Sequence, residues 1–590
     1  MLARLQLCIF GRKSMFETKV DQLVAYAQKK KSVGLDNLAK HVQMPLETVE
    51  LICAILEKGG ILDVNYPISI TEKPSISFRL LPVEPPKDSD GPPKGKTLAS
   101  YTFVADGVPA SVTITDTEKE KDYTIALVEF GTATKIFLDL IKDELLRAVP
   151  SGAQSDVSDI EKAAKAKDDF KQLIVNYLHQ FQLGKEVNDV LVGMLLHKLF
   201  GLGEIEIINH DDWLEEIIIN NSKSSIGVYH RRYGWLRTNI YMPDEEAIFN
   251  YSSQIARRVG RQIANLTPIL DARLETGDRV CSTLAPVSAH GNTITIRRFA
   301  RNPWTIVNLV GAPGYSMTPE MAGMLWQAIH YEMNILVAGG TASGKTTALN
   351  ALASFIPPNQ RILTIEDTRE LMLPPYQWNW VPLLTRNQNA EGLGEVSMLD
   401  LMMTSLRMRP DRILLGEMRR QREAEVLFEA MHTGHSVAST LHADTGIQTI
   451  RRLTSPPISL PPSDLEAVHL IVVQYRDRRK NVRRTLEICE IVPGAKDEDI
   501  TTNVIYRWRP RTDTFDMVGE PNKYLKEINL HTGMTKEEIY ADIKNRAIII
   551  KWMMDNKLSD MESVGRIMSL YYSKPSEVLE IAKKATAAKK

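Results

Sequence analysis

The residues best suited to chemistry lie in one glycine-rich stretch, GGTASGKT, at positions 339–346. The stretch matches G-x-x-x-x-G-K-[ST] and ends in Lys345 and Thr346. An apolar run before it, Ile335–Ala338, predicts a buried strand, and Thr347–Phe355 after it predicts a helix. In such a loop, backbone N–H groups and the positive end of the helix surround an anion. The sequence therefore predicts a nucleotide-binding site.

The residues of this loop have expected parts in binding ATP. Lys345 is predicted to reach the β- and γ-phosphates, and the Thr346 hydroxyl is predicted to ligate Mg²⁺. A chance match in a glycine turn is the alternative, but the strand and helix expected on either side argue against it. The other residues predicted to contact the nucleotide are Gly339, Gly340, Thr341, Ala342, Ser343, Gly344 and Thr347.

Two acidic motifs follow predicted strands further along the chain. Ile362–Ile365 runs into Glu366, and Ile413–Leu415 runs into Gly416 and Glu417. Carboxylates at strand ends can hold hydrated Mg²⁺ or orient an attacking water, although they also serve as helix caps. The second motif is similar to a Walker B strand, with glycine where aspartate is usual.

A histidine-containing motif, TGHSVASTLHA, places His435 and His442 at opposite ends of a predicted strand. A zinc site that includes His432 is the alternative interpretation. Structural zinc sites use four Cys or His ligands at short spacings, and the flanking sequence has no cysteine and no fourth ligand at such a spacing. A metal site is therefore the weaker interpretation of these histidines.

Composition narrows the class of protein. The 590 residues are 43% hydrophobic and 25% charged, with a formal net charge of −1, which indicates several globular domains and argues against a generally basic nucleic-acid binder. The four cysteines are scattered without a C-x-x-C pair, which fits a reducing cytoplasm. No apolar run approaches the roughly 20 residues of a membrane span, so we expect any membrane role to be peripheral.

The apolar pattern divides the chain into six predicted segments. The first resembles a winged helix, and its presumptive recognition helix carries Glu47, Glu50 and Glu57, so protein docking is favoured over DNA binding. The segments are a winged-helix-like docking module at 15–81, a linker at 82–98, a small sheet with helices at 99–200, an α+β subdomain at 203–301, a core at 302–510 and a helical C-terminal appendage at 521–590.

The core alternates helices with short apolar strands, which predicts an α/β fold with a mostly parallel, doubly wound sheet. Its last two expected strands are Val437–Thr440 and Leu470–Gln474. Ligands bind beyond the carboxyl ends of such strands, where the motifs above lie. In the C-terminal segment, two S/T-x-x-E patterns, Thr535–Glu538 and Ser559–Glu562, predict helix capping boxes.

Arginines are concentrated in two regions. In the α+β subdomain, where 215–221, 228–238 and 293–299 predict strands, they include Arg279, Arg297 and Arg298; surface solubility and a basic rim facing a nucleotide are equally good interpretations. The run 476–484, RDRRKNVRR, lies between two apolar strands and predicts a charged hairpin tip, although a nucleic-acid channel is the alternative.

In order along the chain, GGTASGKT, TIEDTREL, RMRPDRILLGEMR and TGHSVASTLHA resemble Walker A, the Asp box, Walker B and the His box of the type II and type IV secretion ATPase superfamily. Glycine before glutamate is normal in that family. The stretch 268–299 looks like its N-terminal, PAS-like subdomain, closest to the archaeal pilus and archaellum branch. The resemblance covers about 203–493. The four-Cys insertion and the AIRNLIRE-type end are absent, so assembly or export is expected rather than retraction.

This resemblance implies a RecA-like P-loop NTPase core and a Mg²⁺-dependent ATPase that works as a homo-hexameric ring. It implies an integral-membrane platform protein as partner, a pilin-like substrate reached indirectly, no direct nucleic-acid partner, and a place at the cytoplasmic face of a membrane. A ring-shaped nucleic-acid motor and a nucleotide-gated scaffold are the alternatives.

The resemblance also assigns expected roles to individual residues. It favours Glu366 for positioning the attacking water and Glu417 for Mg²⁺, although the two compete for the first role. His442 belongs to the His box. The ring architecture would let Arg279, Arg297 or Arg298 act on the γ-phosphate across a subunit interface.

Overall fold

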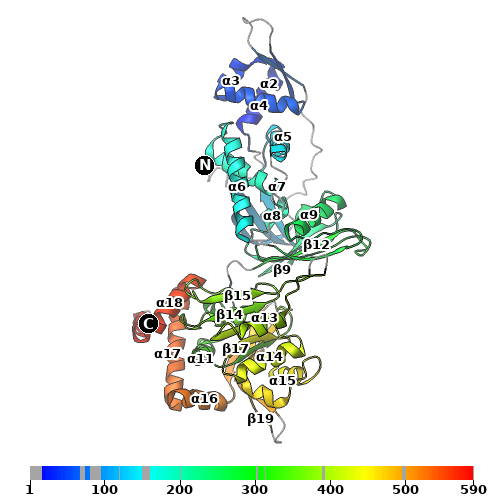
Figure 1. Ribbon diagram of the computed structural model, residues 1–590. Helices are drawn as coiled ribbons and strands as arrows, with labels where there is room; N and C mark the ends of the chain where they lie inside the picture. The colour runs from blue at the N-terminus through cyan, green and yellow to red at the C-terminus, as the bar shows by residue number, and fades with distance from the viewer. Residues whose placement is uncertain are drawn as a thin grey trace. The chain divides into compact units, whose positions relative to one another are not determined.

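A computed structural model describes most of the chain. It divides into two compact units, Met1–Arg298 and Phe299–Lys590, which run from blue to green and from green to red in Figure 1. The described residues are 16–66, 74–79, 95–117, 120–148, 160–199, 201–274, 276–299, 303–312, 314–388, 392–480, 482–494 and 500–588. Most of the predicted linker at 82–98 therefore lies outside the described residues, and Lys96 begins a strand.

The first unit starts with a small helical module. Its helices and strands follow the order of a winged helix, and Val20, Leu23, Val24 and Ala27 form the buried face of its first described helix. On α4, Glu50 accepts a hydrogen bond from the Tyr66 hydroxyl (2.7 Å). The elements are α2 (Lys19–Lys30), β1 (Ser32–Gly34), α3 (Leu35–Val42), α4 (Leu46–Lys58), β2 (Leu62–Asn65) and β3 (Ser75–Phe78), with sheet order β1-β3-β2.

A nine-stranded sheet forms the rest of the first unit, and it joins strands from two predicted segments. The order is β10-β11-β12-β7-β8-β9-β6-β5-β4, and β6 pairs in parallel with β9. The stretch 228–238 contains parts of two antiparallel strands, because the chain turns back between His230 and Gly234. The strands are β4 (Lys96–Ala105), β5 (Val108–Asp116), β6 (Lys121–Leu127), β7 (Leu214–Ile219), β8 (Ser225–His230), β9 (Gly234–Tyr241), β10 (Ile269–Arg273), β11 (Arg279–Thr283) and β12 (Thr293–Arg297).

A buried carboxylate connects the two parts of this sheet. Asp211, which is 1% exposed, accepts hydrogen bonds from the hydroxyls of Tyr101 (2.6 Å) and Tyr123 (2.7 Å) on β4 and β6. Burial raises the pKa of both tyrosines, so both remain hydrogen-bond donors. The other described helices of this unit are α5 (Thr132–Ala148), α6 (Ile160–His179), α7 (Lys185–Leu199), α8 (Glu204–Ile208) and α9 (Glu245–Arg258).

The second unit contains the predicted doubly wound sheet, with order β15-β14-β16-β17-β13-β18-β19-β20-β21. The strands from β15 to β18 are parallel, and an antiparallel extension follows, which gives a RecA-like core. The strands are β13 (Ile335–Gly339), β14 (Ile362–Glu366), β15 (Trp380–Leu384), β16 (Arg412–Leu415), β17 (Ser436–Leu441), β18 (Leu470–Asp477), β19 (Val482–Pro493), β20 (Ile500–Arg509) and β21 (Thr514–Met517).

Helices complete this core, and those after Pro521 are part of it. The Tyr524 hydroxyl donates to the Gln327 side chain on α11 (2.6 Å), and the buried Arg546 guanidinium lies 5.1 Å from the ring centre of Trp326. The helices are α10 (Ile306–Val310), α11 (Pro319–His330), α12 (Lys345–Ala353), α13 (Met398–Ser405), α14 (Gln421–His432), α15 (Gly446–Thr454), α16 (Asn522–Thr532), α17 (Lys536–Asp555), α18 (Met561–Ser573) and α19 (Pro575–Ala588), with a 3₁₀ turn at Pro462–Ala467.

The two predicted capping boxes have different outcomes. Thr535 and Glu538 form the expected reciprocal box at the start of α17. The second prediction, Ser559–Glu562, is wrong because Asp560 caps α18, and its carboxylate accepts from the Ser563 N–H (2.8 Å). A carboxylate one position later satisfies the free N–H of the helix and also favours its positive end.

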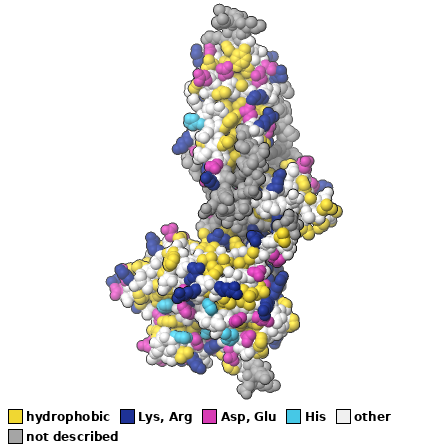
Figure 2. Space-filling model, viewed as in Figure 1, with side chains coloured by type: hydrophobic (Ala, Val, Ile, Leu, Met, Phe, Trp, Pro, Cys, Tyr) yellow, Lys and Arg dark blue, Asp and Glu magenta, His cyan; other side chains and the backbone are white. Residues whose placement is uncertain are grey.

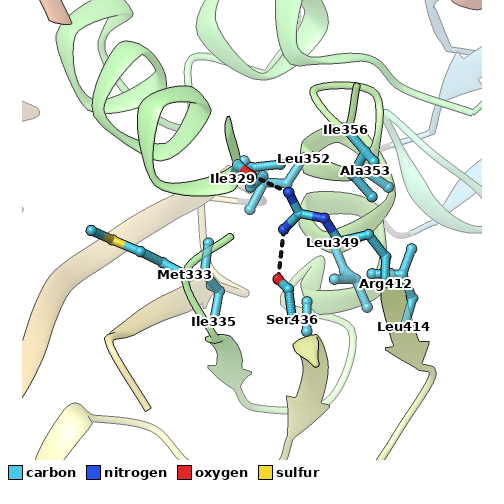
Figure 3. Close-up of a pocket in the computed structure, with 11 residues that line it drawn as sticks. Ile329, Met333, Ile335, Leu349, Leu352, Ala353, Ile356, Arg412, Leu414 and Ser436 are labelled. Carbon is cyan, nitrogen blue, oxygen red and sulfur yellow. Dashed lines mark hydrogen bonds between the residues drawn. The ribbon is translucent and has the colours of Figure 1, made fainter. Parts of the chain in front are cut away.

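One arginine of the Walker-B-like motif supports the core beneath the P-loop helix. Arg412 begins β16 and is 3% exposed. Its guanidinium donates to the Ile329 carbonyl and the Ser436 hydroxyl, both at 2.5 Å, beside a small apolar cavity of about 20 Å³ (Figure 3). Burial lowers the pKa of Arg412 to about 10, which still leaves it charged at neutral pH. Arg412 therefore has a structural role in the core and is too buried to contact a ligand.

The surface of the second unit carries charges of both signs. Among the described residues on the face in Figure 2, Lys and Arg side chains lie close to Asp, Glu and His side chains on the lower body. This mixture agrees with a net charge near zero and differs from the uniformly basic face typical of nucleic-acid binders. Within the described part of the chain, no helix combines the length and the apolar character needed to cross a bilayer.

Candidate functional site

The glycine-rich loop connects β13 to α12, as the sequence predicts. All five residues of β13 are buried, and the loop begins and ends with glycines in the positive-φ region, Gly339 at 152° and Gly344 at 96°. A Cβ on Gly339 would collide with the backbone carbonyl of Gln474. Between them, Ala342 also has a positive φ of 58°. The loop therefore has the tight turn that directs backbone N–H groups toward an anion.

The first residues of α12 bring the reactive side chains of the loop into position. Lys345 is 8% exposed; its ammonium group donates to the Gly340 carbonyl (3.0 Å) and lies 3.3 Å from His442 Nδ1. Thr346 and Thr347 follow in the first turn of the helix. The Ser343 hydroxyl is buried and has no hydrogen-bond partner among the described residues, so the loop retains a polar group available to a ligand.

His442 connects this lysine to the Walker-B-like strand. It follows β17, and its Nε2 lies 3.2 Å from Glu417 Oε1. Burial and the neighbouring positive charge of Lys345 lower the pKa of His442, which favours the neutral ring between ammonium and carboxylate. Residues from three of the sequence motifs therefore meet at adjoining strand ends, because β13, β17 and β16 are parallel neighbours.

Arg419 extends the network to the fourth motif, and the sequence analysis did not single it out. Its guanidinium donates to Glu417 Oε2 through Nη2 (2.7 Å) and Nε (3.0 Å), and to Asp367 Oδ2 through Nη1 (2.8 Å). The signal was present in the sequence, because Arg419 stands two positions after Glu417 in GEMR. Its contact with Asp367 could not be predicted from the sequence, because it requires β14 to lie beside β16 in the sheet.

Glu366 has a different environment from Glu417. It is 2% exposed, and its Oε1 accepts the backbone N–H groups of Glu370 (2.9 Å) and Leu371 (3.0 Å). Its Oε2 has no partner among the described residues, and burial raises the pKa of this carboxyl to about 7. A Cβ on Gly416 would lie 3.2 Å from Glu366 Cγ, so the glycine leaves space for this side chain.

Basic side chains surround the outer end of the loop, and the sequence analysis did not assign them to it. Arg483, from the run 476–484, donates through Nε to the Ala342 carbonyl (3.0 Å). The described residues of that run lie at the end of β18, in the turn after it and at the start of β19, which agrees with the predicted hairpin tip. The wall of an open pocket of about 680 Å³ includes Gly340, Thr341, His442, Arg451, Arg452 and Arg478.

The three arginines predicted to act on the γ-phosphate belong to the first unit. Arg279 forms two hydrogen bonds with Asp271 (3.0 and 2.6 Å), and its register partner on β12 is Arg297, so both lie on one face of the sheet. Arg298 is turned away from that row: its side chain is 4% exposed and donates to the carbonyls of Asp211 and Leu214 (3.0 Å to the latter). The structure does not group the three in one place.

The oxygen donors at the strand ends suit Mg²⁺ better than zinc. Mg²⁺ in nucleotide sites takes one or two carboxylates, a hydroxyl, phosphate oxygens and water. Glu417 and Asp367 could supply the carboxylates, and Thr346, in the first turn of α12, could supply the hydroxyl. In the described part of the chain, no group of three or more His, Cys, Asp or Glu side chains is arranged to hold a metal. His435 and His442 lie at opposite ends of β17.

Comparisons with known proteins agree on one group. A family model described as Type II/IV secretion system protein matches residues 216–479. An uncharacterized Methanocaldococcus jannaschii protein, MJ0900, is 34% identical over 70% of this chain and 76% of its own length. The type IV secretion system protein PtlH of Bordetella pertussis is 35% identical over 48% of this chain and 86% of its own length.

Among solved structures, the VirB11 ATPase of the Brucella suis type IV secretion system, in complex with sulphate, is similar. It is 26% identical, covers 48% of this chain and 93% of its own, and has a TM-score of 0.25. The pilus retraction motor PilT with bound ADP is 17% identical, over 61% of this chain and 95% of its own, with a TM-score of 0.33.

Proposed function

Because the chain belongs to the type II/IV secretion system protein family, we propose that it is a Mg²⁺-dependent ATPase that drives assembly or export of pilin-like filaments or substrates. The observation that carries this proposal is the continuous contact from Lys345 through His442 and Glu417 to Arg419 and Asp367. It brings four separate sequence motifs to one edge of the sheet, where a nucleotide phosphate can meet them.

Lys345 and the loop N–H groups would hold the phosphates of ATP. Phosphoryl transfer requires positioning and charge neutralisation more than covalent chemistry. Lys345 is already oriented by Gly340 and His442, so its ammonium needs to exchange weak neutral partners for phosphate oxygens. Mg²⁺, held by Thr346 and Glu417, would supply further charge neutralisation.

Glu366 is our candidate for positioning the attacking water. A general base works best when its pKa is close to the operating pH, and burial raises the pKa of Glu366 to about 7. One oxygen is held by two backbone N–H groups, and the other has no partner among the described residues. The fixed oxygen would orient the carboxylate while the other accepts a proton from water.

We further propose that the active form is a homo-hexamer at the cytoplasmic face of a membrane. Arg279 or Arg297, exposed in part on the first unit, would approach the γ-phosphate of a neighbouring subunit. The movement would be passed to an integral-membrane platform protein and only indirectly to the filament. The family of the chain supports this arrangement.

Phosphate release by the purified full-length chain tests the proposal. We expect hydrolysis with Mg²⁺, none with EDTA, and no stimulation by single-stranded DNA. Stimulation by DNA would instead support a nucleic-acid motor, and tight ATP binding without turnover would support a nucleotide-gated scaffold. Sedimentation with a non-hydrolysed ATP analogue should show six subunits, and a lasting monomer would reject the ring.

A further inference from the structure

We propose that Arg419 is a positioning residue whose guanidinium holds Glu417 and Asp367 together before a nucleotide binds, in the place that the divalent cation later takes. The inference rests on the proposed ATPase function, and it concerns how this site is kept ready. It makes a specific demand: Arg419 and the metal must compete for the same carboxylate oxygens.

The geometry supports a bridge rather than a simple surface ion pair. Glu417 follows β16 and Asp367 follows β14, and these strands are parallel neighbours. A single planar guanidinium reaches Glu417 Oε2 with two nitrogens, at 2.7 and 3.0 Å, and Asp367 Oδ2 with the third, at 2.8 Å. Only arginine has this fork, so a lysine could hold one carboxylate but could not span both in the same way.

The opposite oxygens of both carboxylates contact a hydroxyl and an imidazole ring. Asp367 Oδ1 accepts from the Thr385 hydroxyl (3.1 Å), and Glu417 Oε1 faces His442 Nε2 (3.2 Å). These contacts keep the two carboxylates oriented while their remaining oxygens face Arg419. Thr385 and His442 therefore orient the two carboxylates, and the Arg419 guanidinium fills the space between them.

Charge explains why a metal would displace the arginine. Two carboxylates and one guanidinium leave a net charge of about −1. Mg²⁺ prefers carboxylate oxygens and carries twice the charge of the guanidinium. The two cations repel each other at such short range.

Exposure explains how the displacement could occur. The Arg419 side chain is 55% exposed, whereas Glu417 is 23% exposed. The arginine can therefore move into solvent at little cost, while the acid stays in place. Exposed ion pairs contribute little free energy on their own, so the pairs of Arg419 with Glu417 and Asp367 would oppose metal binding only weakly.

Direct metal binding tests the competition without relying on turnover. Mn²⁺ replaces Mg²⁺ as a probe, and free Mn²⁺ is measured by its electron paramagnetic resonance signal during titration of the nucleotide-free, full-length chain. We expect Arg419→Gln to bind Mn²⁺ at least about fivefold more tightly than wild type, because one cation is removed from the site. Arg419→Lys should lie between them. Adding Glu417→Gln to Arg419→Gln should abolish the gain.

Arg422 provides the matched control. It stands three residues away on α14, is 73% exposed and pairs with Glu425 (3.0 Å). Arg422→Gln removes the same charge from the same surface, so it corrects for a general change in electrostatic potential. Circular dichroism and thermal unfolding should show that all variants are folded.

Activity then gives a second readout of the competition. With ATP saturating, Arg419→Gln should reach half-maximal hydrolysis at a lower Mg²⁺ concentration than the wild type, because the guanidinium no longer competes for the carboxylate oxygens. Equal or weaker Mn²⁺ binding by Arg419→Gln would overturn the inference, even if kcat falls. Absence of hydrolysis by the wild type would reject the proposed function alone, since the Mn²⁺ titration stands without it.

Discussion

The motif-bearing edge of the second unit and the arginine-bearing sheet of the first unit use similar charged residues in opposite ways. At the first of these, Lys345, His442 and the pair Glu417 and Arg419 come from three separate segments, and each residue lies within 3.3 Å of the next. In the second, the side chains of two residues adjacent in sequence point into different environments. Arg297 is exposed on one face, while the neighbouring Arg298 is held by backbone carbonyls.

Strand direction explains the difference. The carboxyl ends of parallel strands lie along one edge, so residues that follow β13, β14, β16 and β17 must come together. In a strand, successive side chains point to opposite faces, so consecutive arginines cannot share a site. A cluster of charges in the sequence is therefore weaker evidence for a site than charges at equivalent ends of parallel strands.

The largest expected effect comes from Lys345→Ala. Removing the ammonium group that faces the loop and His442 should lower kcat by about a thousandfold, or about 4 kcal/mol in the activation barrier. Phosphate release is the measurement, and Lys551→Ala on the exposed side of α17 is the control. Retention of more than about a tenth of the wild-type kcat, ~1.4 kcal/mol, would contradict the assignment of the loop.

Glu417→Gln should have the next largest effect. The amide keeps the shape of the side chain but removes the charge that Arg419 and a metal would share. We expect kcat to fall by about a hundredfold, while ATP remains bound and can be trapped by rapid filtration. If turnover persisted and ATP did not accumulate, Glu417 would have a structural role only.

Glu366 sharpens the comparison through pH. Its pKa is about 7 in the folded chain, against an ordinary value of 4.5. The folded state therefore keeps a proton that the unfolded state loses, so the free energy of unfolding should decrease as pH rises from about 4.5 to about 7. The loss is on the order of 3 kcal/mol.

Urea denaturation at pH 5, 6, 7 and 8 measures this change. In Glu366→Gln this component should disappear, and the difference between the two proteins isolates it from other titrating groups. The same variant should hydrolyse ATP poorly. If stability depends on pH in the same way in the wild type and in Glu366→Gln, burial does not perturb this carboxyl. Normal ATP turnover by Glu366→Gln would show that Glu366 of the Asp box has a structural role only.

The smallest expected effect concerns the arginines of the first unit. Arg297→Ala or Arg279→Ala, whichever removes the arginine that acts across a subunit interface, should lower kcat at least about tenfold. Mixing either variant with Lys345→Ala subunits should restore some activity, since certain interfaces regain an intact loop and an intact arginine. Arg237→Ala, exposed in the same sheet and paired with Glu120 (2.9 Å), is the control.

Arg298→Ala should behave differently from both. Because its guanidinium satisfies two buried carbonyls, we expect a loss of stability of about 1–3 kcal/mol and no recovery on mixing. Recovery of ATPase activity on mixing with Arg298→Ala subunits would contradict the proposed distinction between the two faces of the sheet. So would a lack of recovery with any of the three arginine variants when co-assembly is confirmed.

The sequence alone determined the parts of this protein that depend on local pattern. The P-loop, the strands around it and the hairpin tip at 476–484 were predictable because glycine turns, apolar runs and alternating strands leave direct marks on the sequence. Even the convergence of Glu417 and His442 with Lys345 followed from the alternation of strands and helices, since that alternation makes the strands parallel. Membership of the family followed from the same motifs.

Only the tertiary structure decided which charged groups touch and which are buried. The bridge from Arg419 to Asp367 depends on β14 lying beside β16, although 45 residues (367–411) separate the end of β14 from the start of β16 in the chain. Burial shifts the pKa of Glu366, and Gly416, which follows the neighbouring strand β16, leaves space for the Glu366 side chain. Desolvation and charge pairing arise from atoms that are distant in sequence, so residue type and spacing do not contain them.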